Sequence, residues 1–165
     1  MSELKTIGFW ASIFSVVLVF IVLWQTQMMR EDLDINNRPW IGGDEFVVLE
    51  DKVLFHYQNF GKIPNTGGKI MRLSTNVMPP RDDVLSDRAD SSPMQVIMPS
   101  QIMTLVISGD DFKKVLQDTR EGKRELFLGV LFFYEYGNQK IGWYGVIGQY
   151  NPITNHVNIE DMWVN

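Results

Sequence analysis

Few side chains in this chain of 165 residues have types and spacings that could do chemistry. There are two histidines: His56 lies in a β-type run beside aromatic residues, and His156 lies in a polar turn. A histidine metal site or a catalytic dyad needs such rings to meet a carboxylate, and nothing in their spacing brings them together. We therefore interpret both as structural residues. A hydrolase or ligand-binding protein would need His56 and an acidic residue to line one pocket.

The acidic and sulfur-containing residues also lack a recognisable site pattern. The acidic pairs fit loop solvation, a helix cap and a solvated tail, and none has the spacing of a calcium loop. The chain has no cysteine, which excludes thiolate metal centres, thiol nucleophiles and disulfides. Its nine methionines are better interpreted as core filling than as copper ligands. We predict no catalytic, metal or cofactor site. The three acidic pairs named above are Asp82-Asp83, Asp110-Asp111 and Glu160-Asp161.

The overall charge argues against a polyanion as partner. There are 15 basic and 20 acidic residues, so the formal net charge is −5. Proteins that bind nucleic acid need a basic face, and we predict no nucleic-acid partner. With 45% hydrophobic and 21% charged residues, the chain has the composition of a folded protein.

One long uncharged segment separates Lys5 from Arg30. Residues 7–24 within it are apolar except for two serines, and as a helix they would measure about 27 Å, close to the hydrocarbon thickness of a bilayer. Trp10 and Trp24 lie near its ends, where indole rings favour the headgroup region. A cleaved signal peptide would be followed by small residues, and this segment is not. The sequence predicts a tail at 1–6 and a retained single-pass transmembrane anchor at 7–29.

The short N-terminal tail favours a cytoplasmic N-terminus and an exported domain. One face of the anchor carries small residues, which would let a second transmembrane helix approach closely. They could equally just dilute an apolar stretch. The lipid bilayer is the expected environment, and another membrane protein, or self-association through the anchor, is the expected partner. The small residues are Gly8, Ala11, Ser12 and Ser15.

Residues 38–165 have the pattern of an all-β domain, after a connector at 30–37 that ends before Pro39. One short helix is expected at 110–119, capped by Asp110 or Asp111 and ended by Gly122. A two-residue hairpin turn is expected at Gly137-Asn138. A polar surface loop should span 79–93 and an apolar run 94–98. The strand spacing is typical of a β-sandwich. The strands are expected at 46–49, 53–60, 69–77, 102–108, 125–136, 140–150 and, as an edge strand, within 153–164.

Three short motifs in this order resemble a family. Residues 37–42 (NRPWIG) are similar to the N-R-P-[WY]-[IV] opening of small membrane-anchored Ig-like β-sandwich proteins of bacteria and archaea. Residues 57–64 (YQNFGKIP) resemble their N-x-G-x-x-P-A segment, with Asn65 in place of the alanine. Residues 133–137 (FYEYG) resemble their Y-x-D-x-x-G hairpin, with Glu135 for aspartate. The resemblance implies an Ig-like fold behind one membrane anchor and implies no activity. In the residues themselves, turn chemistry already accounts for Asn59, Gly61 and Pro64.

These observations favour a non-catalytic accessory or structural subunit of a membrane protein complex. Aromatic residues dominate binding hot spots, so those of the 134–150 region that face outward are interface candidates. Core packing is the alternative for each of them. A membrane-tethered hydrolase or ligand-binding protein, or a pilin-like subunit, are the alternative functions. The interface candidates are Tyr134, Tyr136, Trp143, Tyr144 and Tyr150.

Overall fold

The computed structural model describes residues 2–81, 91–137 and 139–164, with the side chains of 2–12, 31, 32, 34–36 and 44 left out. The chain divides into two compact units, residues 1–37 and 38–165. Because residues 82–90 are not described, most of the predicted surface loop at 79–93 lies outside the described residues.

The first unit is one helix, α1 (Ser2–Asn36), which would measure about 52 Å. Its segment Ile13–Arg30 is long and apolar enough to cross a membrane, by length and composition. All side chains described between 13 and 30 are exposed, as expected for a segment whose surroundings would be lipid. Helical backbone continues through the polar residues of the predicted connector as far as Asn36, ahead of Pro39.

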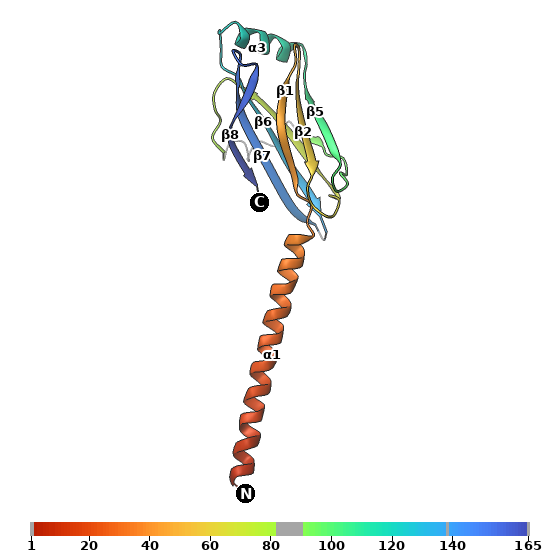
Figure 1. Cartoon of the computed structure of the whole chain (residues 1–165), viewed down its shortest axis with the longest axis vertical. Helices are drawn as coiled ribbons and strands as arrows, with labels where there is room; N and C mark the ends of the chain where they lie inside the picture. Colours follow the sequence, from red (N-terminus) through yellow and green to blue (C-terminus); the bar gives the residue numbers. More distant parts are fainter. Residues whose placement is uncertain (1, 82–90, 138, 165) are drawn as a thin grey trace. The chain divides into compact units, whose positions relative to one another are not determined.

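The second unit consists of two antiparallel sheets facing each other (Figure 1). The three-stranded sheet has the order β1-β2-β5 and the five-stranded sheet the order β4-β3-β6-β7-β8. An all-β domain behind an apolar helix is thus confirmed. The strands are β1 (Ile41–Val48), β2 (Val53–Asn59), β3 (Gly67–Thr75), β4 (Ser91–Pro93), β5 (Ile102–Ile107), β6 (Phe127–Tyr136), β7 (Lys140–Asn151) and β8 (His156–Val164).

Alternation of side chains builds the core between the sheets. In β2 every second residue from Val53 to Asn59 is buried. The central strand β6 is buried on both faces, because its inner face packs in the core and its outer face carries a second apolar cluster. Aromatic rings meet across the core: Tyr57 lies 4.6 Å from Phe132, and Phe46 lies 4.5 Å from Phe55, between ring centroids.

The second cluster covers the outer face of the five-stranded sheet. Trp163 lies flat on Gly145 of the neighbouring strand, where a Cβ atom would come 2.5 Å from the indole, so only glycine fits. The Arg81 guanidinium lies 5.4 Å from the Trp143 ring centroid and 5.5 Å from that of Trp163. The apolar members are Phe127, Ile147 and Trp163, with Leu73 and Trp143 beside them.

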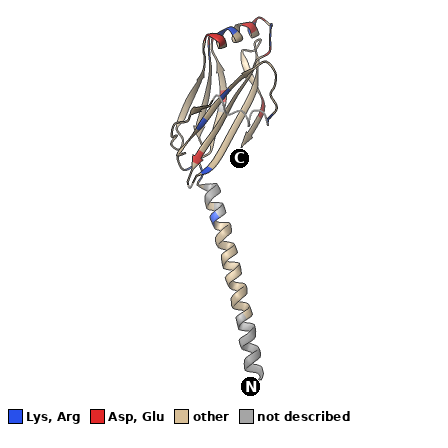
Figure 2. Ribbon diagram, turned by 180° about the vertical axis from the view of Figure 1, so that it is seen from behind, with Lys and Arg blue, Asp and Glu red and all other residues tan. Residues whose placement is uncertain are grey.

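Helix α3 (Asp110–Arg120) lies across one end of the sandwich, which we call the distal end (Figure 1). It carries both acidic and basic side chains, from Asp110 and Asp111 in its first turn to Arg120 in its last (Figure 2). Phe112 and Leu116 are buried against the core, as the spacing predicts. The predicted aspartate cap is wrong: Gly109 is the N-cap and makes no side-chain bond. Its φ of 139° is one that L-residues rarely adopt, so this cap position favours glycine. Asp110 and Asp111 follow it and lie in the first turn of the helix.

One further local prediction needs correction. Tyr136 pairs with Lys140, so the hairpin loop has three residues rather than two. The predicted apolar run 94–98 lies outside the strands, and buried asparagine side chains bond its backbone groups at Gln95 and Ile97.

Candidate functional site

One hollow of the domain is an apolar groove between the edge strands β1 and β8, with a volume of about 480 Å³. It lies near the end of the domain where β1 begins, which we call the proximal end. Gly42 has no side chain, and a Cβ atom there would lie 3.2 Å from Phe60 and 3.8 Å from Tyr144, so glycine leaves space between these two groove residues. The side chains on its walls are much more exposed than core residues: Phe60 is 55% exposed, and Met162 and Val164 are each 53% exposed. The groove residues are Trp40, Ile41, Gly42, Gly43, Phe60, Tyr144, Met162 and Val164.

Two of the groove walls, Trp40 and Phe60, are held by a buried asparagine. The Asn59 Oδ1 atom accepts hydrogen bonds from the Trp40 and Gly61 backbone N–H groups at 3.1 and 2.9 Å. Its Nδ2 group donates to the carbonyls of Ile63 and Ile97 at 2.7 and 3.1 Å. The Phe60 N–H group donates to the Trp40 carbonyl at 2.7 Å. Because Asn59 is fully buried with both ends of its amide satisfied, it fixes how the chain leaves β2 beside the groove.

The motif residues around Asn59 also have structural roles. A Cβ atom on Gly61 would lie 2.3 Å from the Arg38 carbonyl oxygen, so the backbones can meet only at glycine. Asn65, also fully buried, accepts from the Ile97 N–H group at 2.6 Å and donates to the Gln95 carbonyl at 3.2 Å. The Arg38 guanidinium stacks on the Trp40 ring, 3.6 Å from its centroid. The structural interpretation of Asn59 and Gly61 therefore fits the geometry.

One hydrogen bond lies at the floor of the groove. The Tyr144 hydroxyl donates to the Gly43 carbonyl at 3.3 Å, and Tyr144 is 5% exposed. This bond joins β7 to β1 across the gap between the sheets.

Most of the predicted interface aromatics are core residues. Tyr134, Tyr144 and Tyr150 are buried between the sheets, as in the core-packing alternative. Tyr136 is partly buried against the same core, and Trp143 is partly buried in the outer-face cluster. The reason is strand parity, since in β6 and β7 the tyrosines at even positions point inward with Phe132 and Val146.

Of the predicted helix-packing residues, Ser15 is described as an exposed helical residue. The side chains of Gly8, Ala11 and Ser12 lie outside those that the structure describes, although their backbone is helical.

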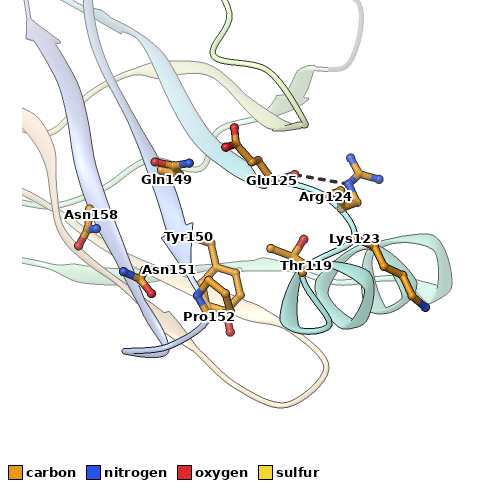
Figure 3. A pocket seen from close by; sticks show the side chains of 10 residues that line it. Thr119, Lys123, Arg124, Glu125, Gln149, Tyr150, Asn151, Pro152 and Asn158 are labelled. Atoms are coloured by element: carbon orange, nitrogen blue, oxygen red, sulfur yellow. Dashed lines mark hydrogen bonds between the residues drawn. The ribbon is translucent and has the colours of Figure 1, made fainter.

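A second, polar hollow of about 440 Å³ lies at the distal end, between the end of α3 and strands β7 and β8 (Figure 3). Its amide side chains, Gln149, Asn151 and Asn158, lie on one side. Lys123 and Arg124 lie on the other, and their side chains point away from the amides. Lys123 forms an ion pair with Glu121. The hydrogen bond between the two side chains raises the pKa of Lys123 and lowers the pKa of Glu121.

The histidines lie apart from both hollows. His56 is half-buried on the outer face of the three-stranded sheet, and its Nδ1 atom lies 3.0 Å from the Thr104 hydroxyl of the neighbouring strand. His156 is exposed at the start of β8. Among the residues that the structure describes, no group of three His, Cys, Asp or Glu side chains could hold a metal ion.

No family model, curated protein or solved structure matches this chain. The function must therefore be argued from the chain's own geometry. Sequence reasoning did not identify the groove. Trp40 and Phe60 lie within or beside the sequence motifs. The contact between β1 and β8 that brings Met162 and Val164 beside them joins distant parts of the chain, and no local sequence pattern indicates it.

Proposed function

We propose that this protein is a membrane-anchored, non-catalytic β-sandwich protein that binds another membrane protein as an accessory or structural subunit. The observation that carries the proposal is the apolar groove between β1 and β8, with three walls more than half exposed. Exposed apolar surface of this kind marks interaction sites.

The anchor supports a membrane protein as the partner. Trp40, a groove residue, follows the last residue of α1 by four positions, so the chain between them can span only about 14 Å. The part of that helix beyond the candidate span, residues 31–36, would measure about 9 Å and would act as a spacer above the bilayer. A partner held in the same membrane meets the groove at high effective concentration.

The proposal includes an Ig-like fold for the domain and a membrane topology for the chain. The two facing antiparallel sheets support an Ig-like sandwich of the resembled family. A single membrane crossing by α1 would place the domain on the side opposite the N-terminus.

Photo-crosslinking from the groove tests the proposal. A photoreactive amino acid replaces Phe60 or Met162 in the full chain, and illumination of native membranes should yield adducts with one membrane protein. Ile153, 93% exposed in the turn between β7 and β8, is the matched control position and should give no such adduct. Absence of adducts from the groove, or equal yield from Ile153, would contradict the proposal.

A second function, binding of a small polar ligand, is favoured by the distal hollow and its three amides. Amide side chains offer paired donors and acceptors to a neutral polar molecule. Native mass spectrometry of the extracted protein should then show a retained small molecule that Gln149→Ala loses and Gln58→Ala keeps. If both variants and the wild type give the bare chain mass, this second function is wrong.

A further inference from the structure

The two sheets differ in width, and the difference leaves part of an inner sheet face uncovered. Strand β1 contacts β7 and β8, so the three-stranded sheet is aligned with that side of the five-stranded sheet. On the other side β3 extends past β5. Ile70, Arg72 and Ser74 of β3 pair with core residues of β6 and share their inward face. Ile70 is buried, but Arg72 and Ser74 are exposed.

The neighbouring edge strand β5 has none of the features that protect sheet edges. It has six residues, IMTLVI, with no charge and no proline, and its pairing with β2 has no register shift. It lies at the edge of its sheet (Figure 1). Its outward side chains are apolar at both ends: Ile102 is 66% and Val106 41% exposed. Long, flat, uncharged edges are templates for an added strand.

The three other edges are each protected. Strand β8 has a bulge and two acidic residues, and the Asp161 carboxylate accepts from the Met162 backbone N–H group at 2.9 Å. Strand β1 has a bulge between Gly43 and Glu45. Strand β4 has three residues and ends at Pro93. These are the usual means of preventing edge pairing, and only β5, among the described edge strands, lacks all of them.

We infer that β5 accepts an extended segment of a partner protein as a fourth strand, with an acidic residue of that segment facing Arg72. An added strand would lie over the uncovered inner face of β3. Its inward side chains would meet Arg72 and Ser74, and its outward side chains would extend the apolar row formed by Val47, Leu54 and Val106. Main-chain hydrogen bonds supply affinity in this recognition mode, and alternate side chains supply specificity.

Arg72 determines the chemistry of the partner. It forms no ion pair with any described residue, and its charge acts on the Tyr57 hydroxyl at the rim of the core. A carboxylate brought over it would gain a charge-assisted hydrogen bond. This surface is separate from the groove between β1 and β8, so the inference goes beyond the proposed function and does not depend on it.

Peptide selection on the full chain in detergent tests the inference. A phage library of random twelve-residue peptides is selected on the wild type and, in parallel, on Arg72→Glu. Peptides enriched on the wild type should carry an acidic residue between β-branched residues at alternating positions, and should slow amide hydrogen exchange in β5. They should bind Arg72→Glu at least about tenfold more weakly, and selection on that variant should enrich basic residues instead.

Controls separate this surface from the groove. Val106→Lys places a charge on the edge strand and should abolish binding of the selected peptides, whereas Met162→Lys in the groove should leave it unchanged. Failure to enrich any peptide, or protection of β1 or β8 instead of β5, would overturn the inference. Neither result would affect crosslinking from Phe60, so the proposed function would stand or fall separately.

Discussion

At the scale of single residues, the proximal end depends on the side chain of Asn59. Four hydrogen bonds to backbone groups of four different residues meet at one fully buried amide. Such groups are costly to leave unpaired, at about 1–3 kcal/mol each. Asn59 therefore contributes more to the shape of the groove than any residue that lines it.

Asn59→Ala should lower the free energy of unfolding by about 3 kcal/mol or more, because the freed backbone groups stay buried without partners. Denaturant unfolding of the full chain in detergent measures the change. The matched control is Gln58→Ala, on the outward face of the same strand, which should change stability by less than about 0.5 kcal/mol. Equal stability of the two variants would show that the amide network is not needed.

Gly61→Ala tests the close approach of the two backbones beside Asn59. Its Cβ atom would overlap the Arg38 carbonyl and the Pro39 and Trp40 backbone, and we expect a loss of about 2 kcal/mol or more. Gly67→Ala is the control, because its Cβ atom would meet only the Glu135 carboxylate at an ordinary 3.7 Å. Thermal unfolding of both variants provides the comparison, and similar midpoints would contradict the account.

Tyr57 makes stability depend on pH at the alkaline end. Burial raises the pKa of its hydroxyl above the ordinary value, and the Arg72 charge opposes that shift. The folded state therefore keeps its proton while the unfolded chain loses it above about pH 10. The contribution is complete below that pH and is lost as the pH rises through the folded-state pKa. Unfolding free energies between pH 8 and about 11 should fall less steeply for Tyr57→Phe than for the wild type; parallel curves would contradict this.

At the scale of elements, α3 is tied to the sandwich by its last residue. Arg120 donates to the Leu49 and Glu50 carbonyls at 2.8 and 2.6 Å and to the Tyr150 hydroxyl at 3.2 Å. One side chain thus joins the helix, the β1–β2 turn and β7. Arg120→Lys should cost about 1 kcal/mol, since an ammonium group cannot reproduce this fork of donors. Lys114→Ala on the same helix is the control, and chemical denaturation that does not separate the two would argue against this role.

The elements also show how far sequence reasoning reaches. Alternation and turn residues predicted β2, β5, β6 and β7 closely, because these strands follow local rules. Residues 94–98 were predicted only as an apolar run, and the side chains that bond their backbone come from Asn59 and Asn65, which are distant in the sequence. Tyr144 was an interface candidate with core packing as the alternative, and local sequence did not decide between them because the side of a strand that faces the core depends on pairing. The groove depends on β1 and β8 meeting across more than 100 residues, a contact with no local signal.

At the scale of the whole molecule, the two units suggest complementary roles. A helix able to cross a membrane precedes an all-β domain with an apolar groove and an unprotected edge strand. The groove and the β5 edge lie on opposite sides of the sandwich, since one is bounded by β1 and the other lies beyond β2. A partner bound in the groove would therefore not displace a partner bound at the β5 edge.

The most direct test of the central proposal is extraction of native membranes in mild detergent, followed by native mass spectrometry of every species that contains this chain. The account predicts a stoichiometric complex with another membrane protein, which Phe60→Asp disrupts and Ile153→Asp leaves intact. A bare monomer from wild-type membranes, or complexes equally insensitive to both substitutions, would contradict it.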